Sequence, residues 1–336
     1  MSGLRVTVAV FDESSGWVVP QSFVDRLAVG LPAESVTIRR VSSRAELREA
    51  LGTTDVLVGF PMNEAPGADA APSLRWIVLT ETAGEPVASL GEAIARGVRV
   101  TTANAFRAPQ VAEHALALLL ALVRRLHRAM ARQSEHHWAD DELARQVGTL
   151  SGRTVGVLAS GAVGQAIAQR VHAFGARVLA TRRDADNPYM FVEEVYTTDR
   201  LDELLVQVDA LVVALPRLAS TRGLIGEREL AKLRPHSLLV DVSRGGVVQE
   251  APLLEAVRRG RFDGVALDVF ETEPLPPSSP LWTMPSVIVT PHIAAASPRY
   301  WEQAAEAIAA NLHRFVAEEP LADLVPIEWT RDVARA

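Results

Sequence analysis

The segment from Leu150 to Arg183 constrains the fold of this chain more than any other. It reads LSGRTVGVLASGAVGQAIAQRVHAFGARVLATRR. Thr154 to Leu158 is short, apolar and β-branched, which is typical of a buried strand. Apolar residues at helical spacing follow until Gly175, and Arg177 to Ala180 has the composition of a second strand. A strand, a glycine turn, a helix and a strand within about 30 residues predict a dinucleotide-binding βαβ unit.

The turn after the first strand is expected to bind a pyrophosphate through its backbone. A helix N-terminus offers free N–H groups and the positive end of its dipole to such a group. The residues expected to make these contacts are Ser160, Gly161, Ala162 and Val163. Ala159 stands where the first glycine of a G-x-G-x-x-G pattern would be. We predict that the turn is kept if Ala159 is not left-handed.

The end of the second strand predicts which dinucleotide is preferred. An NAD site commonly has an acidic residue here, which binds the ribose 2′-OH. This chain has Arg182 and Arg183 instead, and two guanidinium groups suit a 2′-phosphate. We therefore expect NADP(H) to be favoured over NAD(H). The alternative is that both arginines are solvated surface charges.

The composition excludes several classes of protein. With no cysteine, the chain has no disulfide, thiolate nucleophile or cysteine metal ligand. Its net charge of −7 argues against nucleic-acid binding. The apolar run Ala115 to Val123 is short for a bilayer span. We expect a cytoplasmic protein with no membrane partner and no metal.

The rhythm of strands and helices along the 336 residues predicts two domains. The expected fold class is α/β, with two doubly wound parallel sheets and a cleft between them. A flavodoxin-like substrate domain is expected over residues 1–103 and 297–336, and a Rossmann nucleotide domain over 104–296. Within the latter, Ala108 to Arg132 is predicted to be one long helix. The strands predicted for the first domain are Val6–Phe11, Ser35–Arg39, Asp55–Phe60, Trp76–Thr80 and Val98–Thr102.

Polar residues follow several predicted strands of the second domain. Because ligands bind beyond the carboxyl ends of parallel strands, we expect Arg244, Asp268, Glu273 and His292 to lie on one rim. This set suffices for hydride chemistry on a carbonyl. Arg244 would bind a carboxylate and polarise the carbonyl. His292 would transfer the hydroxyl proton, and Glu273 would orient the imidazole and favour its protonated form.

The motifs that carry these residues also resemble those of a known family. They are DALVVALP at 209–216, LLVDVSRGGVVQE at 238–250, GVALDVFETEP at 264–274 and TPHI at 290–293. In this combination the chain resembles the D-isomer-specific 2-hydroxyacid dehydrogenases, above all their glyoxylate and hydroxypyruvate reductase branch. The resemblance implies hydride transfer between NAD(P)H and a small 2-oxo acid, giving the D-2-hydroxy acid. It also implies a homodimer, formed through an arm at about residues 110–150.

The resemblance further implies roles for individual residues. Arg244, Glu273 and His292 would be catalytic, and Asp268 would hold the nicotinamide carboxamide. The substrate site would include Thr82, Ala83, Gly84, Arg244, His292 and Trp282. Further cofactor contacts are expected from Leu215, Pro216, Thr221, Val242, Ser243, His292 and Ala294.

Some residues depart from the family pattern. Asp241 stands where asparagine is common, and Glu81 and Glu85 flank the loop expected to bind the substrate carboxylate. Two acids beside an anion site leave the substrate open. One alternative is therefore a dehydrogenase of an amino- or phosphono-substituted 2-oxo acid. The other is a dinucleotide-sensing binding protein similar to the corepressors built on this fold.

Overall fold

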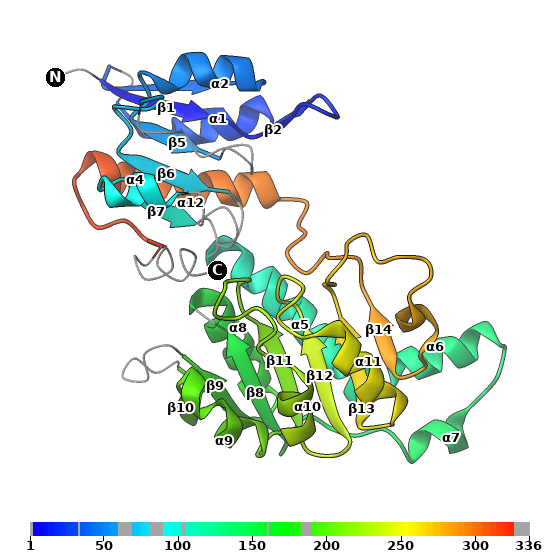
Figure 1. The fold of residues 1–336 in the computed structure, drawn as a ribbon. Helices are drawn as coiled ribbons and strands as arrows, with labels where there is room; N and C mark the ends of the chain where they lie inside the picture. Colours follow the sequence, from blue (N-terminus) through cyan, green and yellow to red (C-terminus); the bar gives the residue numbers. More distant parts are fainter. Residues whose placement is uncertain are drawn as a thin grey trace. The chain divides into compact units, whose positions relative to one another are not determined.

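The chain folds into two compact units in a computed structural model. One unit comprises Met1–Phe106 and Ser297–Ala336, and the other comprises Arg107–Ala296. The structure describes residues 3–32, 34–59, 69–80, 90–102, 105–159, 161–182 and 190–325. Figure 1 shows the path of the chain, with the first unit built from the blue and cyan segments and completed by the orange helix α12.

The first unit is a five-stranded parallel sheet covered by helices on both faces. Its strands lie in the order β4-β1-β5-β6-β7, which is the 2-1-3-4-5 order of flavodoxin-like folds. Helices α1 and α12 pack on one face, and α2 and α4 on the other. The strands are β1 (Leu4–Val8), β4 (Val36–Arg40), β5 (Val56–Val58), β6 (Trp76–Leu79) and β7 (Arg99–Thr102). The helices are α1 (Gln21–Leu27), α2 (Arg44–Leu51), α4 (Gly91–Ala95) and α12 (Tyr300–Val316).

The first predicted strand is shorter than expected. Val6 to Phe11 was predicted as one strand, but β1 ends at Val8. The chain then forms a small antiparallel hairpin of β2 (Phe11–Asp12) and β3 (Trp17–Val18). Asp12 closes its turn by accepting hydrogen bonds from the backbone N–H and hydroxyl of Ser14.

The second unit is a seven-stranded parallel sheet in the order β10-β9-β8-β11-β12-β13-β14. The 3-2-1-4-5-6 order of a Rossmann fold is therefore present, with β14 added at the edge. Both faces are covered, and successive residues of a strand face opposite layers. The strands are β8 (Thr154–Ala159), β9 (Arg177–Thr181), β10 (Glu194–Tyr196), β11 (Ala210–Ala214), β12 (Ser237–Asp241), β13 (Phe262–Leu267) and β14 (Val287–Val289). These sheets confirm the predicted α/β class.

Two helical layers cover the second sheet (Figure 1). Val155 and Val157 of β8 face the layer of α5 and α8, whereas Leu158 faces the opposite layer. The first layer is α5 (Ala108–Val123) and α8 (Gly161–Ala173). The second layer is α9 (Leu201–Leu205), α10 (Glu227–Lys232) and α11 (Glu250–Arg258).

The predicted long helix from Ala108 to Arg132 is in fact two helices. Helix α5 ends at Val123, and α6 (Leu126–Ser134) starts after Arg125, whose φ is 55°. A left-handed residue breaks an α-helix, because the hydrogen-bond ladder cannot continue through it. A short helix, α7 (Asp140–Ala144), completes the arm-like segment.

The apolar helical stretch Ala105–Val123 is longer than the run identified in the sequence. By length and composition it passes as a candidate membrane span, with half of its window buried. Its apolar side is the core of the second unit, where Leu119 and Leu122 are fully buried. A Cβ atom added at Gly264 of β13 would lie 2.8 Å from Leu122 Cδ2. This close packing is that of a core helix.

Candidate active site

Three consecutive strands at one side of the sheet, β12, β13 and β14, present polar residues at their carboxyl ends. Arg244 follows β12, Asp268 follows β13, and His292 lies three residues beyond β14. Arg244 is held close to β13 because Gly245 follows it. Gly245 has φ 65°, and a Cβ atom there would lie 2.1 Å from the Phe270 carbonyl oxygen. Only glycine permits this approach.

His292 lies between an acidic residue, Glu273, and a basic residue, Arg244. Its Nδ1 is 2.6 Å from Glu273 Oε2, and its Nε2 is 3.4 Å from Arg244 Nη1. The other Glu273 oxygen accepts the backbone N–H of Phe270 at 3.0 Å. Glu273 is thereby tied to the loop and to the imidazole at once. About a third of the His292 and Glu273 side chains is exposed, 36% and 34%, so a ligand can reach them.

The donors and acceptors of this trio define the imidazole tautomer. Glu273 only accepts when ionised, so Nδ1 of His292 carries the hydrogen it shares with that carboxylate. Arg244 only donates, so Nε2 faces it with a lone pair in neutral histidine. When His292 is protonated, Nε2 carries the mobile proton. Of the two ring nitrogens, Nε2 is therefore the one that can exchange a proton without breaking the bond to Glu273.

His292 has an unusual backbone, with φ 53°. Such a conformation in a non-glycine residue costs about 1–3 kcal/mol and is found where the surroundings enforce it. Here the enforcing group is Asp268. Its Oδ1 accepts the Ile293 N–H at 3.0 Å, and its Oδ2 accepts the Ala294 N–H at 2.9 Å.

Asp268 is completely buried and receives two further donors. Thr290 Oγ1 lies 2.6 Å from its Oδ1, and His114 Nε2 lies 3.3 Å from the same atom. Burial raises the pKa of Asp268, but these hydrogen bonds outweigh burial and bring it below its ordinary value. Asp268 is therefore a buried, ionised carboxylate.

Asp241, at the end of β12, is the second buried carboxyl group of this edge. Its Oδ1 accepts the backbone N–H of Ser243 at 2.9 Å, which shapes the start of the Arg244 loop. Burial raises its pKa to about 6, and the charge of nearby Asp268 adds to that rise. An asparagine here could accept the same hydrogen bond without the cost of a charge.

The turn after β8 fits a dinucleotide. Ala159 is the last residue of the strand, and the left-handed residue is instead Gly161, with φ 62°. Among the described residues, no atom lies within 4 Å of the place where a Cβ of Gly161 would be. Helix α8 begins at Gly161, followed by Ala162 and Val163, so its N-terminus faces open space. Ser160 lies outside the described residues.

The remaining predicted cofactor residues lie at the ends of neighbouring strands. Leu215 and Pro216 directly follow β11, and Thr221 Oγ1 donates to the Pro216 carbonyl at 2.5 Å. Arg182 directly follows β9, and Arg183 lies outside the described residues. Val242 and Ser243, which directly follow β12, are buried, and so is Ala294 in the turn around His292.

Part of the predicted substrate site lies in the described residues and part does not. Thr82, Ala83 and Gly84, with Glu81 and Glu85, lie outside the described residues. Trp282 lies in the short 3-10 helix Pro280–Thr283, where its Nε1 donates to the Pro276 carbonyl at 3.0 Å and half of its surface is exposed. In the described part of the chain, no group of three metal-ligating side chains occurs.

Two residues of the site were missed in the sequence. His114 of α5 and Thr290 both contact Asp268. Thr290 belongs to the TPHI motif but was not singled out. The available signal for His114 was a polar residue at helical spacing between the apolar Val111 and Leu118.

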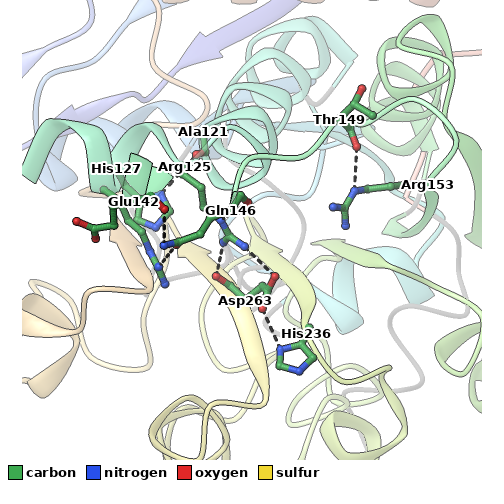
Figure 2. A network of polar contacts seen from close by, with 10 residues as sticks. Ala121, Arg125, His127, Glu142, Gln146, Thr149, Arg153, His236 and Asp263 are labelled. Atoms are coloured by element: carbon green, nitrogen blue, oxygen red, sulfur yellow. Dashed lines mark hydrogen bonds and ion pairs between the residues drawn. The ribbon is translucent and has the colours of Figure 1, made fainter. Parts of the chain in front are cut away.

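A second polar network lies at the opposite end of β13 (Figure 2). Arg125 Nη1 and Nη2 donate to the backbone oxygen and to Oδ2 of Asp263 at 2.5 and 2.7 Å. Arg125 Nε donates to the Gln146 carbonyl at 3.1 Å, and His236 Nδ1 lies 3.0 Å from Asp263 Oδ1. This buried arginine ties the junction of α5 and α6 to the sheet.

This fold and this site define a class. A Rossmann sheet, an open glycine turn and a histidine paired with a glutamate are those of a nicotinamide-dinucleotide-binding α/β protein. Residues 116–294 match the model of the NAD-binding domain of D-isomer specific 2-hydroxyacid dehydrogenases. The chain belongs to this family, as the motifs in its sequence predicted.

Individual relatives bear related names. The chain is 38% identical over 315 residues to D-3-phosphoglycerate dehydrogenase of Mycobacterium tuberculosis, covering 90% of this chain and 58% of that protein. It is 34% identical to a glyoxylate reductase of Korarchaeum cryptofilum, covering 88% of this chain and 86% of that one. The structure of an NADPH-dependent glyoxylate/hydroxypyruvate reductase from Sinorhizobium meliloti matches with a TM-score of 0.75 at 27% identity, covering 97% and 99% of the two chains. The chain thus spans little more than half the length of the mycobacterial relative.

Proposed function

We propose that this protein reduces a small 2-oxo acid of the glyoxylate or hydroxypyruvate type to the D-2-hydroxy acid with NADPH. The observation that carries the proposal is the trio at the sheet edge. His292 Nδ1 is bonded to Glu273 at 2.6 Å, and its Nε2 faces Arg244 at 3.4 Å. The glyoxylate reductase relative, which the chain covers over most of its length, supports the same chemistry.

The chain's own residues divide the work of the reaction. When bound, the nicotinamide cofactor would supply a hydride for the carbonyl carbon. Protonated His292 supplies a proton from Nε2 to the carbonyl oxygen, while Nδ1–H stays bonded to Glu273. Arg244 donates hydrogen bonds to the substrate carboxylate and to the developing oxyanion. Glu273 stabilises the imidazolium before transfer and keeps the ring oriented after it.

We also propose that the preferred cofactor is NADP(H). Arg182 lies directly after β9, where the adenosine ribose binds in Rossmann domains. Arg183 follows it in the sequence. The Sinorhizobium meliloti protein, which has a similar fold, was solved in complex with NADP. An arginine at this position suits a 2′-phosphate better than a free 2′-OH.

The segment of about residues 110–150 is proposed to be the arm of a homodimer. Helices α6 and α7 have no buried residue. Met130 and Trp138 expose 69% and 87% of their surface. Large apolar side chains this exposed are typical of a surface that a partner covers. Sedimentation velocity should show a dimer, and Trp138→Asp should shift it toward the monomer.

The test of the proposed activity is NADPH oxidation, followed by its absorbance, with a panel of 2-oxo acids. The panel contains glyoxylate, hydroxypyruvate, pyruvate, phenylpyruvate and amino- or phosphono-substituted 2-oxo acids, each with NADPH and with NADH. Turnover with NADPH well above NADH would support both proposals. A preference for NADH would contradict the role of the arginines, and no turnover with any acid would contradict the activity.

The mycobacterial relative adds a second candidate substrate. It is a D-3-phosphoglycerate dehydrogenase and covers 90% of this chain at 38% identity. The panel therefore includes 3-phosphohydroxypyruvate and, in the oxidation direction, D-3-phosphoglycerate. A kcat/KM for the phosphorylated acid at least tenfold above that for glyoxylate would favour this candidate.

A further inference from the structure

His114 lies on α5 beside residues of the apolar core, and the proposed reaction does not use it. Its Nε2 lies 3.3 Å from Asp268 Oδ1 and 3.1 Å from Thr290 Oγ1. Only 19% of its side chain is exposed. Its neighbours Val111 and Ala115 on the same helix belong to the core of the unit. The imidazole is therefore held at the interior side of the sheet edge.

The hydrogen-bond chemistry assigns a proton to His114 Nε2. Thr290 Oγ1 lies 2.6 Å from Asp268 Oδ1, which only accepts when ionised. The single hydroxyl hydrogen of Thr290 is thus committed to Asp268, and its Oγ1 offers only lone pairs to His114. Both neighbours of His114 Nε2 are then acceptors. Nε2 must carry the hydrogen, which His114 shares between Thr290 Oγ1 at 3.1 Å and Asp268 Oδ1 at 3.3 Å.

Asp268 in turn holds the turn that presents His292. Its donors Thr290, Ile293 and Ala294 lie two residues before and one and two residues after His292. The turn has a left-handed residue at its centre, so it depends on these bonds to keep its conformation. A fully buried carboxylate is stable only while enough donors face it. The loss of any donor to Asp268 weakens the hydrogen bonds that hold the residues on both sides of His292.

We propose that His114 is a positioning residue that, by donating from Nε2 to Asp268, holds the turn in which His292 acts. His114 does not touch the reacting atoms in this role. The role in turnover rests on the proposed function, because there the position of His292 Nε2 determines the rate. The role in positioning does not need turnover and is tested separately.

Two substitutions distinguish donation from packing. His114→Leu keeps the bulk and removes the donor, whereas His114→Gln places an amide N–H near the position of Nε2. We expect kcat to fall roughly tenfold to a hundredfold in His114→Leu, the size of effect that a small misplacement of a catalytic group produces. His114→Gln should recover kcat to within about threefold of the wild type. Equal losses in both variants, or full activity of His114→Leu, would overturn the proposal.

A second readout uses NMR of the full chain labelled at its 8 histidines. The His292 ring signal is assigned by its loss in His292→Asn. It should shift and broaden in His114→Leu and stay near the wild-type position in His114→Gln. An unmoved signal in His114→Leu would overturn the positioning role even in a protein without measurable turnover. If the wild type reduces no acid but this signal moves, only the proposed function fails.

His313 provides a matched control in the other unit. Its Nε2 makes a comparable hydrogen bond, to the Val29 carbonyl oxygen at 3.1 Å. His313→Leu should leave both kcat and the His292 signal unchanged. If His313→Leu lowers kcat as much as His114→Leu does, loss of a histidine hydrogen bond acts on the protein in general, and the specific role of His114 is wrong.

Discussion

Strand β13 carries a carboxylate at each end, and the two hold different parts of the protein. Asp263, near its start, has a side chain 38% exposed and binds the arm through Arg125. Asp268, just past its end, is fully buried and binds the turn around His292. An aspartate thus acts as an anchor at each end of β13, partly exposed at its start and fully buried at its end. The carboxylate of Asp268 has four protein donors because solvent does not reach it.

Helix α5, together with the two residues that follow it, reaches both carboxylates. His114 and Arg125 are eleven positions apart, which corresponds to about 16 Å along a helix. Asp263 and Asp268 are five positions apart, which corresponds to about 17 Å along a strand. The helix and the strand therefore run antiparallel and match in length. One helix–strand pair therefore links the proposed assembly surface to the proposed catalytic site.

The largest expected effect is on kcat, and it comes from the turn that buried Asp268 holds. His292→Asn removes the proton donor but tolerates the left-handed backbone, because asparagine adopts that conformation readily. We expect kcat to fall about 10²- to 10⁴-fold, with the melting temperature and NADPH affinity close to those of the wild type. Steady-state kinetics, calorimetry and NADPH fluorescence check this. Full turnover would contradict the role of His292.

The next largest effect is on stability, and it comes from the partly exposed Asp263 at the start of β13. Arg125→Leu leaves Asp263 and two backbone carbonyls without their buried donor. We expect a loss of about 3 kcal/mol in the free energy of unfolding and a weaker dimer. Urea unfolding and sedimentation measure the two. Arg124→Leu is the control, because exposed Arg124 makes a single side-chain hydrogen bond within the described residues, to the Gly148 carbonyl. An equal loss of stability there would contradict a specific role of Arg125.

Asp241→Asn removes a buried charge without removing the acceptor of the Ser243 hydrogen bond. The folded-state pKa of Asp241 is about 6, above the ordinary 3.8. The folded protein therefore binds a proton that the unfolded chain lacks between those values, and stability falls as the pH rises from about 4 to about 6. At pH 8 the variant should be more stable by about 2–3 kcal/mol. Unfolding curves from pH 4 to pH 8 should show a flatter slope; an unchanged slope would contradict it.

The smallest effect is expected from His236→Gln. His236 is mostly exposed and shares Asp263 with the buried Arg125. Exposed ion pairs contribute less than about 1 kcal/mol, so the free energy of unfolding and the dimer should change little. Urea unfolding at low and at high salt is the measurement. A loss as large as that of Arg125→Leu would mean that His236 carries the anchor.

The fold could be predicted because its determinants are local. The βαβ unit is encoded by an apolar strand, a glycine turn and a helix ended at Gly175. The hairpin at Phe11–Val18 was missed because two-residue strands show no alternation. The break at Arg125 was missed because arginine carries no preference for a left-handed backbone. That conformation is stabilised by Asp263 and Gln146, which are distant in sequence.

The site was predictable where strand ends bring residues together. Arg244 and His292 follow β12 and β14, which flank β13 on either side, so their proximity follows from parallel topology. His114 could not be placed in this way, because it comes from a helix that crosses the sheet in the other direction. Its partner Asp268 is defined only once α5 is packed on β13.

The match in length between α5 and β13 limits how this chain can vary. One residue inserted or deleted between His114 and Arg125 would rotate one end of the helix by about 100° relative to the other. Either the imidazole or the guanidinium would then point away from its carboxylate. Natural variants of this family that keep both contacts should therefore differ in sequence along this helix but not in its residue count.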